Sequence, residues 1–120
     1  MIRMIRRRLI IPRGDTGSFT IPTLGAVNQG DVAVFSIFDP LTQKTVFEKE
    51  IEATSDTITV SFNHEDTVNL VAKKYLWDIK IYINPQRDDE NILIGADEIN
   101  SYYAAFSLPV CEIKEVAQDV

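Results

Sequence analysis

The chain has 120 residues, of which 45% are apolar and 25% are charged, which is typical of one soluble globular domain whose core needs no metal or disulfide. The one cysteine cannot form an internal disulfide, and no apolar run approaches the ~20 residues that span a bilayer, so a disulfide-stapled extracellular module and a membrane-spanning protein are both disfavoured. The net charge of −6 is unevenly distributed, because five of the twelve basic residues lie within the first thirteen positions.

The first segment, residues 1–8, is predicted to be a basic arm or an edge strand guarded by arginines. The 107 residues after position 13 carry seven basic and eighteen acidic side chains, a net charge of −11. A basic segment on an acidic body can bind nucleic acid or the acidic face of a neighbouring copy. Because the acidic body repels a phosphate backbone, we favour docking on protein over nucleic acid. The expected interface residues are Arg3, Arg6, Arg7 and Arg8.

Turn and strand signals alternate through the first half of the chain. Residues 13–17 contain two glycines and an aspartate, which favour a turn. Residues 31–38 are apolar on both faces, as in a covered central strand, and residues 39–44 are a hairpin turn. The strands expected over the whole chain are residues 2–11, 18–21, 31–38, 45–51, 57–62, 75–83, 92–94 and 102–110.

A corner between two sheets is predicted at residues 63–83. A short helical turn begins at Asn63 and reaches Val71, with acidic residues in its first turn, where the helix dipole favours them. The strand that follows carries large apolar side chains at alternate positions. At its start, Tyr75 and Trp77 match the corner tyrosine and the core position two residues later in immunoglobulin-like sandwiches. Because Trp77 shares a face with three isoleucines, we favour core packing for it over an exposed ligand platform.

The last third of the chain is predicted to hold an exposed loop at residues 84–91 and a final strand at residues 102–110. One face of that strand consists of Ala104, Phe106, Leu108 and Val110. With about seven or eight strands and one short helical turn, the expected fold is an all-β sandwich. The expected divisions are the basic segment 1–8, the β-sandwich domain 9–111 and a polar tail 112–120.

No pattern in the sequence predicts a catalytic residue, a metal site or a cofactor. A Cys111 nucleophile would need an activating base, and the chain has one histidine, so we expect Cys111 to be a packed side chain. That histidine, His64, is expected at the surface, because one histidine is too few for a zinc site. Residues 88–90 are acidic but lack the spacing and turn glycine of a calcium loop, so a solvated loop tip is favoured. Residues 13–15 spell the Arg-Gly-Asp adhesion tripeptide, but an ordinary turn is the favoured interpretation.

Five segments follow one another in a recognisable order: Ile11–Thr16, Val32–Phe38, Phe47–Ile51, Glu65–Leu70 and Tyr75–Ile79. Together they resemble the amino-terminal domain family of upper baseplate proteins from tailed phages of Gram-positive bacteria. The resemblance covers about residues 9–110. It implies an immunoglobulin-like antiparallel β-sandwich that acts as a docking module and has no catalytic residues.

The expected function is therefore that of a non-enzymatic phage or prophage structural protein, located in the virion and in the bacterial cytoplasm during assembly. Its expected partners are other copies of itself or other tail and baseplate proteins, with no nucleic acid and no membrane. The alternative is a carbohydrate-binding host-adhesion module, in which exposed tyrosines stack on sugar rings. The candidates for that aromatic patch are Tyr82, Tyr102 and Tyr103, since Tyr82 lies on the solvated face of its strand.

Overall fold

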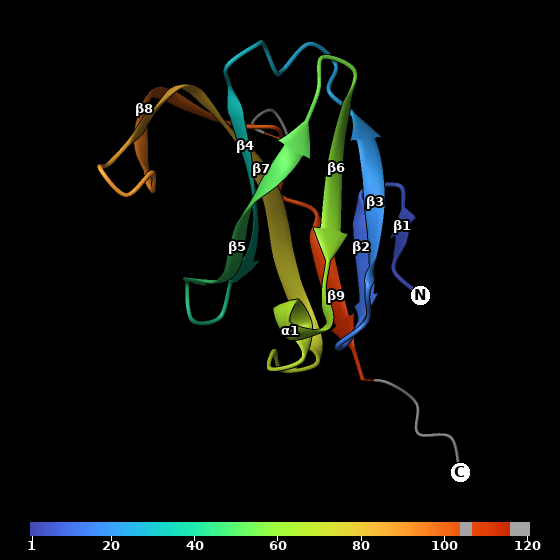
Figure 1. Cartoon of the computed structure of the whole chain (residues 1–120). Helices are drawn as coiled ribbons and strands as arrows, with labels where there is room; N and C mark the ends of the chain where they lie inside the picture. The colour runs from blue at the N-terminus through green and yellow to red at the C-terminus, as the bar shows by residue number, and fades with distance from the viewer. Residues whose placement is uncertain (104–106, 116–120) are drawn as a thin grey trace.

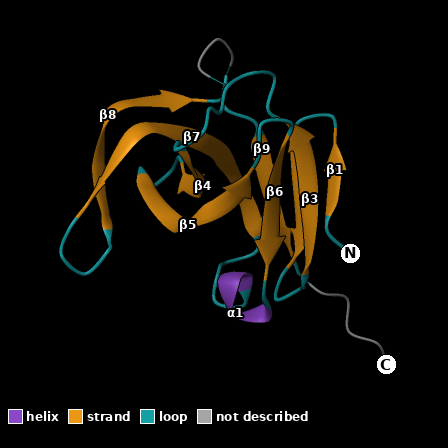
Figure 2. Ribbon diagram, turned by 45° about the horizontal axis from the view of Figure 1, so that its top comes forward, coloured by secondary structure: helices purple, strands orange, loops and turns teal. Residues whose placement is uncertain are grey.

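The computed structural model describes residues 1–103 and 107–115, which form strands and one helical turn and confirm the all-β prediction (Figures 1 and 2). In chain order the elements are β1 (Arg3–Ile5), β2 (Arg8–Pro12), β3 (Gly17–Pro22), β4 (Val32–Asp39), β5 (Lys44–Ala53), β6 (Thr57–Phe62), α1 (His64–Thr67), β7 (Lys73–Arg87), β8 (Leu93–Ser101) and β9 (Val110–Lys114). The predicted hairpin turn between residues 39 and 44 is confirmed, because it joins β4 to β5.

Hydrogen bonding joins eight of these strands in the order β1-β2-β9-β7-β4-β5-β6-β3, and β8 pairs with β7 outside that path. The β2–β9 pair is parallel, with Leu9 opposite Cys111, so the prediction of a wholly antiparallel sandwich is wrong at this pair. The two strands come from opposite ends of the chain, so no tight turn forces them to run antiparallel. The immunoglobulin-like identity of the fold stays a prediction.

Aromatic side chains join the β3–β6 pair to β4 and β7 across the core. The Phe19 ring centroid on β3 lies 5.6 Å from that of Trp77 on β7 and 6.1 Å from that of Phe35 on β4. Phe62 on β6 packs edge-to-face on Phe35 at 5.4 Å. All four side chains are buried, so the predicted core position of Trp77 is confirmed.

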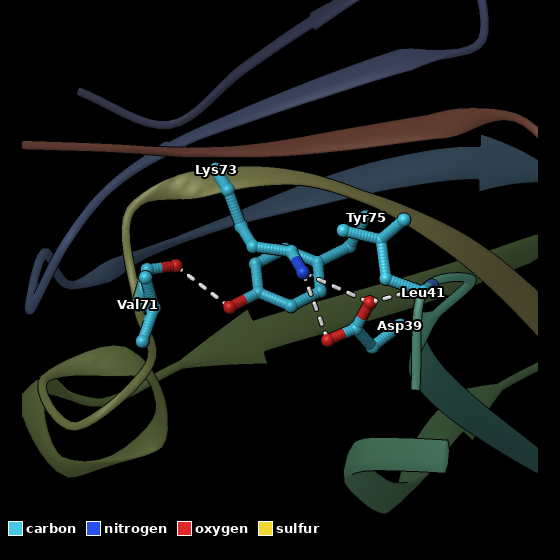
Figure 3. Close-up of polar contacts among 5 residues, drawn as sticks. All are labelled: Asp39, Leu41, Val71, Lys73 and Tyr75. Atoms are coloured by element: carbon cyan, nitrogen blue, oxygen red, sulfur yellow. Dashed lines mark hydrogen bonds and ion pairs between the residues drawn. The ribbon is translucent and has the colours of Figure 1, made fainter. Parts of the chain in front are cut away.

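The predicted corner forms between α1 and β7 (Figure 3). The Tyr75 hydroxyl donates a hydrogen bond of 2.7 Å to the Val71 carbonyl, four residues earlier, as a corner tyrosine does. The Lys73 ammonium lies 5.2 Å from the Tyr75 ring centroid and contacts both carboxylate oxygens of Asp39 at 2.9 Å. The helical turn is shorter than predicted, because it ends at Thr67.

The β7–β8 hairpin differs most from the prediction. β7 continues beyond residue 83 to Arg87, through Asn84 at a φ of 54°, so the loop predicted at residues 84–91 is reduced to a tight turn. β8 is correspondingly longer than the predicted strand 92–94. Figures 1 and 2 show this hairpin leaning away from the other strands, on the opposite side of the molecule from β1.

The predicted last strand, residues 102–110, is wrong. Residues 102 and 103 lie in a turn after β8, whereas Ala104 and Phe106 lie outside the described residues. The strand that follows is β9, which begins at Val110 and lies between β2 and β7. The first residues of the predicted polar tail, Glu112 to Lys114, therefore belong to the sheet, and residues 116–120 lie outside the described residues.

Candidate docking surface

The β1–β2 connection is a tight turn made of two arginines. The single strand predicted over residues 2–11 is therefore wrong, because the chain reverses within it. Ile5 pairs with Arg8, so Arg6 and Arg7 alone join the strands, and we call these two residues the basic turn. Arg6 has a φ of 58°, in the left-handed region where glycine, asparagine or aspartate is usual in short hairpins. Backbone strain of this kind gathers at functional positions, which makes the basic turn a candidate contact site.

Contacts with core side chains hold the basic turn in place. The Trp77 indole N–H donates a 2.9 Å hydrogen bond to the Arg7 carbonyl, although the Trp77 side chain is fully buried. The Arg7 guanidinium lies 5.7 Å from the centroid of the Tyr103 ring, which in turn packs on Trp77 at 5.2 Å. These contacts fix the backbone of the turn, so its position is set before any partner arrives.

The structure divides the four predicted interface arginines into two kinds. Arg8 forms an ion pair with Glu112 of β9 and lowers the pKa of that carboxyl below its ordinary value. Arg7 rests against Tyr103, as described above. Arg3 and Arg6 are exposed, and neither side chain has an ion-pair partner within the part of the chain that the structure describes. Arg6 is therefore the arginine best placed to meet a partner beside the turn.

Two hollows flank the basic turn, and both are lined by Arg6 and Arg7. The first, which we call the apolar groove, has a volume of about 470 Å³ and also includes Ile21, Pro22, Leu24, Ala26, Tyr102 and Tyr103. The second has a volume of about 640 Å³ and includes Ile5, Arg8 and residues 107–110. A row of apolar side chains with arginines at its border suits an amphipathic, acidic partner surface.

Leu24 is an exposed lining residue of the apolar groove that was not among the residues predicted from the sequence. Its side chain is 81% exposed and its φ is 52°, so both its position and its backbone are unusual for leucine. The loop around it is nevertheless fixed, because Thr23 donates to the Asp56 carbonyl at 3.0 Å and to the Ser55 carbonyl at 2.6 Å. The segment from Pro22 to Gly25, which carries two turn-forming residues around Leu24, was the sequence signal for its exposure.

The predicted aromatic patch does not form as expected. Tyr103 is 7% exposed, so the expectation that it is an exposed aromatic is wrong, because the chain turns inward after β8 and packs its ring on Trp77. Tyr102 and Tyr82 are half-buried. They line different hollows, since Tyr102 borders the apolar groove and Tyr82, on β7, borders a hollow with residues 48–50 of β5.

The end of the β7–β8 hairpin, residues 88–94, forms a second projecting surface that we call the hairpin tip. The Asp88 carboxylate accepts hydrogen bonds from the backbone N–H groups of Glu90 at 2.8 Å and Ile92 at 3.0 Å. Ile92 and Ile94 are 54% and 65% exposed. The side chain of Asp88, the first residue of the tip, therefore orders the turn.

An ion pair braces the hairpin against the body. The Arg87 guanidinium contacts both carboxylate oxygens of Glu50 on β5, at 2.9 and 3.0 Å. The pair lowers the pKa of Glu50 below its ordinary value and raises that of Arg87. The hairpin is therefore held to β5 at its far end as well as to β4 through the ladder of β7.

The remaining candidate residues have structural partners. Burial raises the pKa of the Cys111 thiol to about 12, and its predicted packing in the core is confirmed. The His64 ring nitrogen Nδ1 lies 2.8 Å from the Gly14 carbonyl oxygen, and Arg13 forms an ion pair with Glu115. Residues 13–15 therefore hold β2 to its neighbours as an ordinary turn.

Across residues 1–103 and 107–115, no group of three or more histidine, cysteine, aspartate or glutamate side chains is placed to hold a metal ion. The same residues include no helix that is long and apolar enough to cross a membrane. No family model, curated protein or solved structure matches this chain.

Proposed function

We propose that the chain is a non-enzymatic docking module that binds another protein at the basic turn and the apolar groove beside it. The observation that carries the proposal is the union of exposed Leu24 with exposed Arg6 at one hollow, on a backbone that is strained at both residues. A leucine and an arginine that are exposed at one hollow form an anchor when a partner covers them both.

The electrostatics of the rest of the chain support this proposal. Each carboxyl group whose pKa is lowered has a named cation beside it, Asp39 with Lys73, Glu50 with Arg87 and Glu112 with Arg8, so these groups hold strands together. The net charge of −11 beyond residue 13 opposes a phosphate backbone. A protein partner that offers acidic and apolar side chains suits the surface better.

The finer proposal is that this docking occurs in a phage or prophage particle, as part of a tail or baseplate. It is supported by the sequence resemblance over about residues 9–110 and by the all-β architecture. The alternative of sugar binding has less support, because Tyr103 is buried and the other two tyrosines lie apart.

Particle incorporation tests the proposal. Tail particles are purified from a strain that encodes the chain, and the protein is quantified by mass spectrometry. We expect the wild-type protein at a fixed ratio to the major tail protein, and much less of a Leu24→Ser/Arg6→Glu variant. A matched variant, Leu41→Ser/Lys44→Glu in the β4–β5 turn, is expected to incorporate normally, because Leu41 is similarly exposed at 82%. Absence of the wild-type protein from the particles overturns the phage assignment.

A further inference from the structure

We propose, resting on the docking function above, that the partner at the apolar groove is a second copy of this chain, which inserts its β7–β8 hairpin tip there. The two surfaces are complementary in chemistry. The tip exposes Ile92 and Ile94 next to acidic residues 88–90, whereas the groove exposes Leu24 next to Arg6. Apolar side chains thus meet apolar side chains while carboxylates meet a guanidinium.

The charges of both surfaces are available for this contact. The carboxylates of Asp89 and Glu90 have no hydrogen-bond or ion-pair partner within residues 1–103 and 107–115, and neither does the Arg6 guanidinium. Asp88 is different, because its carboxylate is already used to order the tip. The contact therefore pairs exposed charges of opposite sign and breaks no existing interaction.

The tip is ordered before it binds. Backbone hydrogen bonds of 3.0 Å close its turn from Asp88 to Ile92 and from Asn91 to Asp88, and the Arg87 guanidinium also contacts the Asn91 carbonyl at 3.2 Å. On the other side, the groove is fixed by the Thr23 contacts and by the hydrogen bond from Trp77 to Arg7. Two preformed surfaces lose little conformational entropy when they associate.

The tip and the groove cannot meet within one molecule. Figures 1 and 2 show the β7–β8 hairpin on one side of the molecule and β1, which leads into the basic turn, on the other. The chain is elongated, with a longest dimension of 51 Å. A tip-to-groove contact is therefore made between copies and joins two different patches, so each bound pair keeps one free tip and one free groove. Such a contact builds a ring or a filament by repetition.

Sedimentation velocity over a wide concentration range tests the contact, with the full chain and two single variants. Ile94→Ser removes an anchor of the tip, and Leu24→Ser removes the anchor of the groove. We expect the wild-type mass to rise with concentration, and each variant to weaken association at least about tenfold, because burial of one large aliphatic side chain contributes roughly that much. The controls are Val71→Ser and Leu41→Ser, with side chains 68% and 82% exposed outside both surfaces, and they are expected to associate like the wild type.

Mixing the two variants gives the decisive result. The Leu24→Ser protein keeps an intact tip and the Ile94→Ser protein keeps an intact groove, so an equimolar mixture is expected to form a one-to-one pair of twice 13.6 kDa and nothing larger. A wild-type protein that stays monomeric at every concentration overturns the inference, as does a mixture that stays monomeric or controls that weaken equally. If the wild type is monomeric but particle incorporation still depends on Leu24, this inference fails and the proposed docking function stands.

Discussion

Tyr75 joins three kinds of interaction at one corner of the fold. Its ring is buried, its hydroxyl donates to the Val71 carbonyl, and the Lys73 ammonium lies over its face while pairing with Asp39 (Figure 3). Burial raises the pKa of the Tyr75 hydroxyl, so it remains a hydrogen-bond donor at any ordinary pH. This one side chain thus fixes the chain reversal between α1 and β7.

Replacing Tyr75 with phenylalanine removes the hydroxyl and leaves the ring in place. We expect the free energy of unfolding to fall by about 0.5–1.5 kcal/mol, since the Val71 carbonyl loses its partner. Urea denaturation followed by circular dichroism measures the change. The control is Tyr82→Phe, whose hydroxyl has no hydrogen-bond partner in the described part of the chain, and it is expected to be nearly neutral. Equal effects of the two changes would contradict the corner hydrogen bond.

The burial of Cys111 gives a second prediction for a single residue. Its thiol is buried and burial raises its pKa to about 12, so the reactive thiolate is scarce at pH 8. We expect iodoacetamide to leave the native protein unlabelled over hours at pH 8 and to label it rapidly in urea, as followed by intact-mass spectrometry. Rapid labelling without urea would show that the β2–β9 region opens readily.

Single residues were predictable where their neighbours repeat a pattern. Trp77 could be placed in the core because Ile79 and Ile81 share its face, and both are buried with it. Tyr103 could not be placed, because β8 ends at Ser101 and Tyr103 lies in the turn after it, where no strand alternation assigns its side chain to a face. The exposure of Leu24 was indicated only by Pro22 and Gly25 on either side of its turn, since apolar character alone favours burial.

Among the elements, the β7–β8 hairpin shows how a strand can be hidden from sequence patterns. Asn84 and Pro85 read as turn residues, yet β7 passes through both and pairs Pro85 with Ala96. The extended part of the hairpin faces solvent on much of its surface, so burial imposes no alternation there. Its position against β5 involves a contact between residues far apart in the sequence, the pair of Arg87 with Glu50.

That ion pair gives a prediction about the element itself. Replacing Arg87 with alanine releases the hairpin from β5, so we expect faster hydrogen exchange of the tip amides, with the β4–β7 ladder unchanged. The urea midpoint should hardly move, because partly exposed ion pairs add little to global stability. Lys44→Ala is the control, since Lys44 is exposed and forms no ion pair among the described residues. Unchanged exchange at the tip would show that the ladder with β8 alone holds the hairpin.

At the scale of the molecule, the ion pairs set a dependence of stability on pH. Lys73, Arg87 and Arg8 lower the pKa values of Asp39, Glu50 and Glu112 below the ordinary values of 3.8 for aspartate and 4.5 for glutamate. A carboxyl group with a lowered pKa in the folded state adds stability that is complete above its ordinary pKa and is lost as the pH falls through the lowered one. We therefore expect the urea midpoint to fall as the pH drops below about 4.

Asp78 changes the pH dependence of stability in the opposite direction. Burial raises its pKa even though Ser101 and the Ile79 N–H donate to it, so its charged form is costly in the folded state. That cost is absent below its ordinary pKa and grows as the pH rises through the raised one. An Asp78→Asn variant is expected to have a higher urea midpoint than the wild type at pH 7 and a similar one at pH 3. A lower midpoint at pH 7 would mean that the charge itself is needed there.

The fold class of the whole molecule could be predicted from the sequence, but the order in which the strands pair could not. Alternating strands and the lack of a long helical pattern were enough for an all-β fold. The parallel β2–β9 pair could not be predicted, because β9 is short. Its charged residues Glu112 and Lys114 alternate with the buried Cys111 and Ile113, so the segment resembles a polar tail.

The buried indole beneath the basic turn has an optical consequence. Trp77 is the one tryptophan of the chain, it is hydrogen-bonded to the Arg7 carbonyl, and it touches Tyr103, which lines the apolar groove. Its emission spectrum therefore senses the groove through a single layer of side chains. Occupancy of the groove can be read from the intrinsic fluorescence of the unlabelled protein, and the signal belongs to one known position.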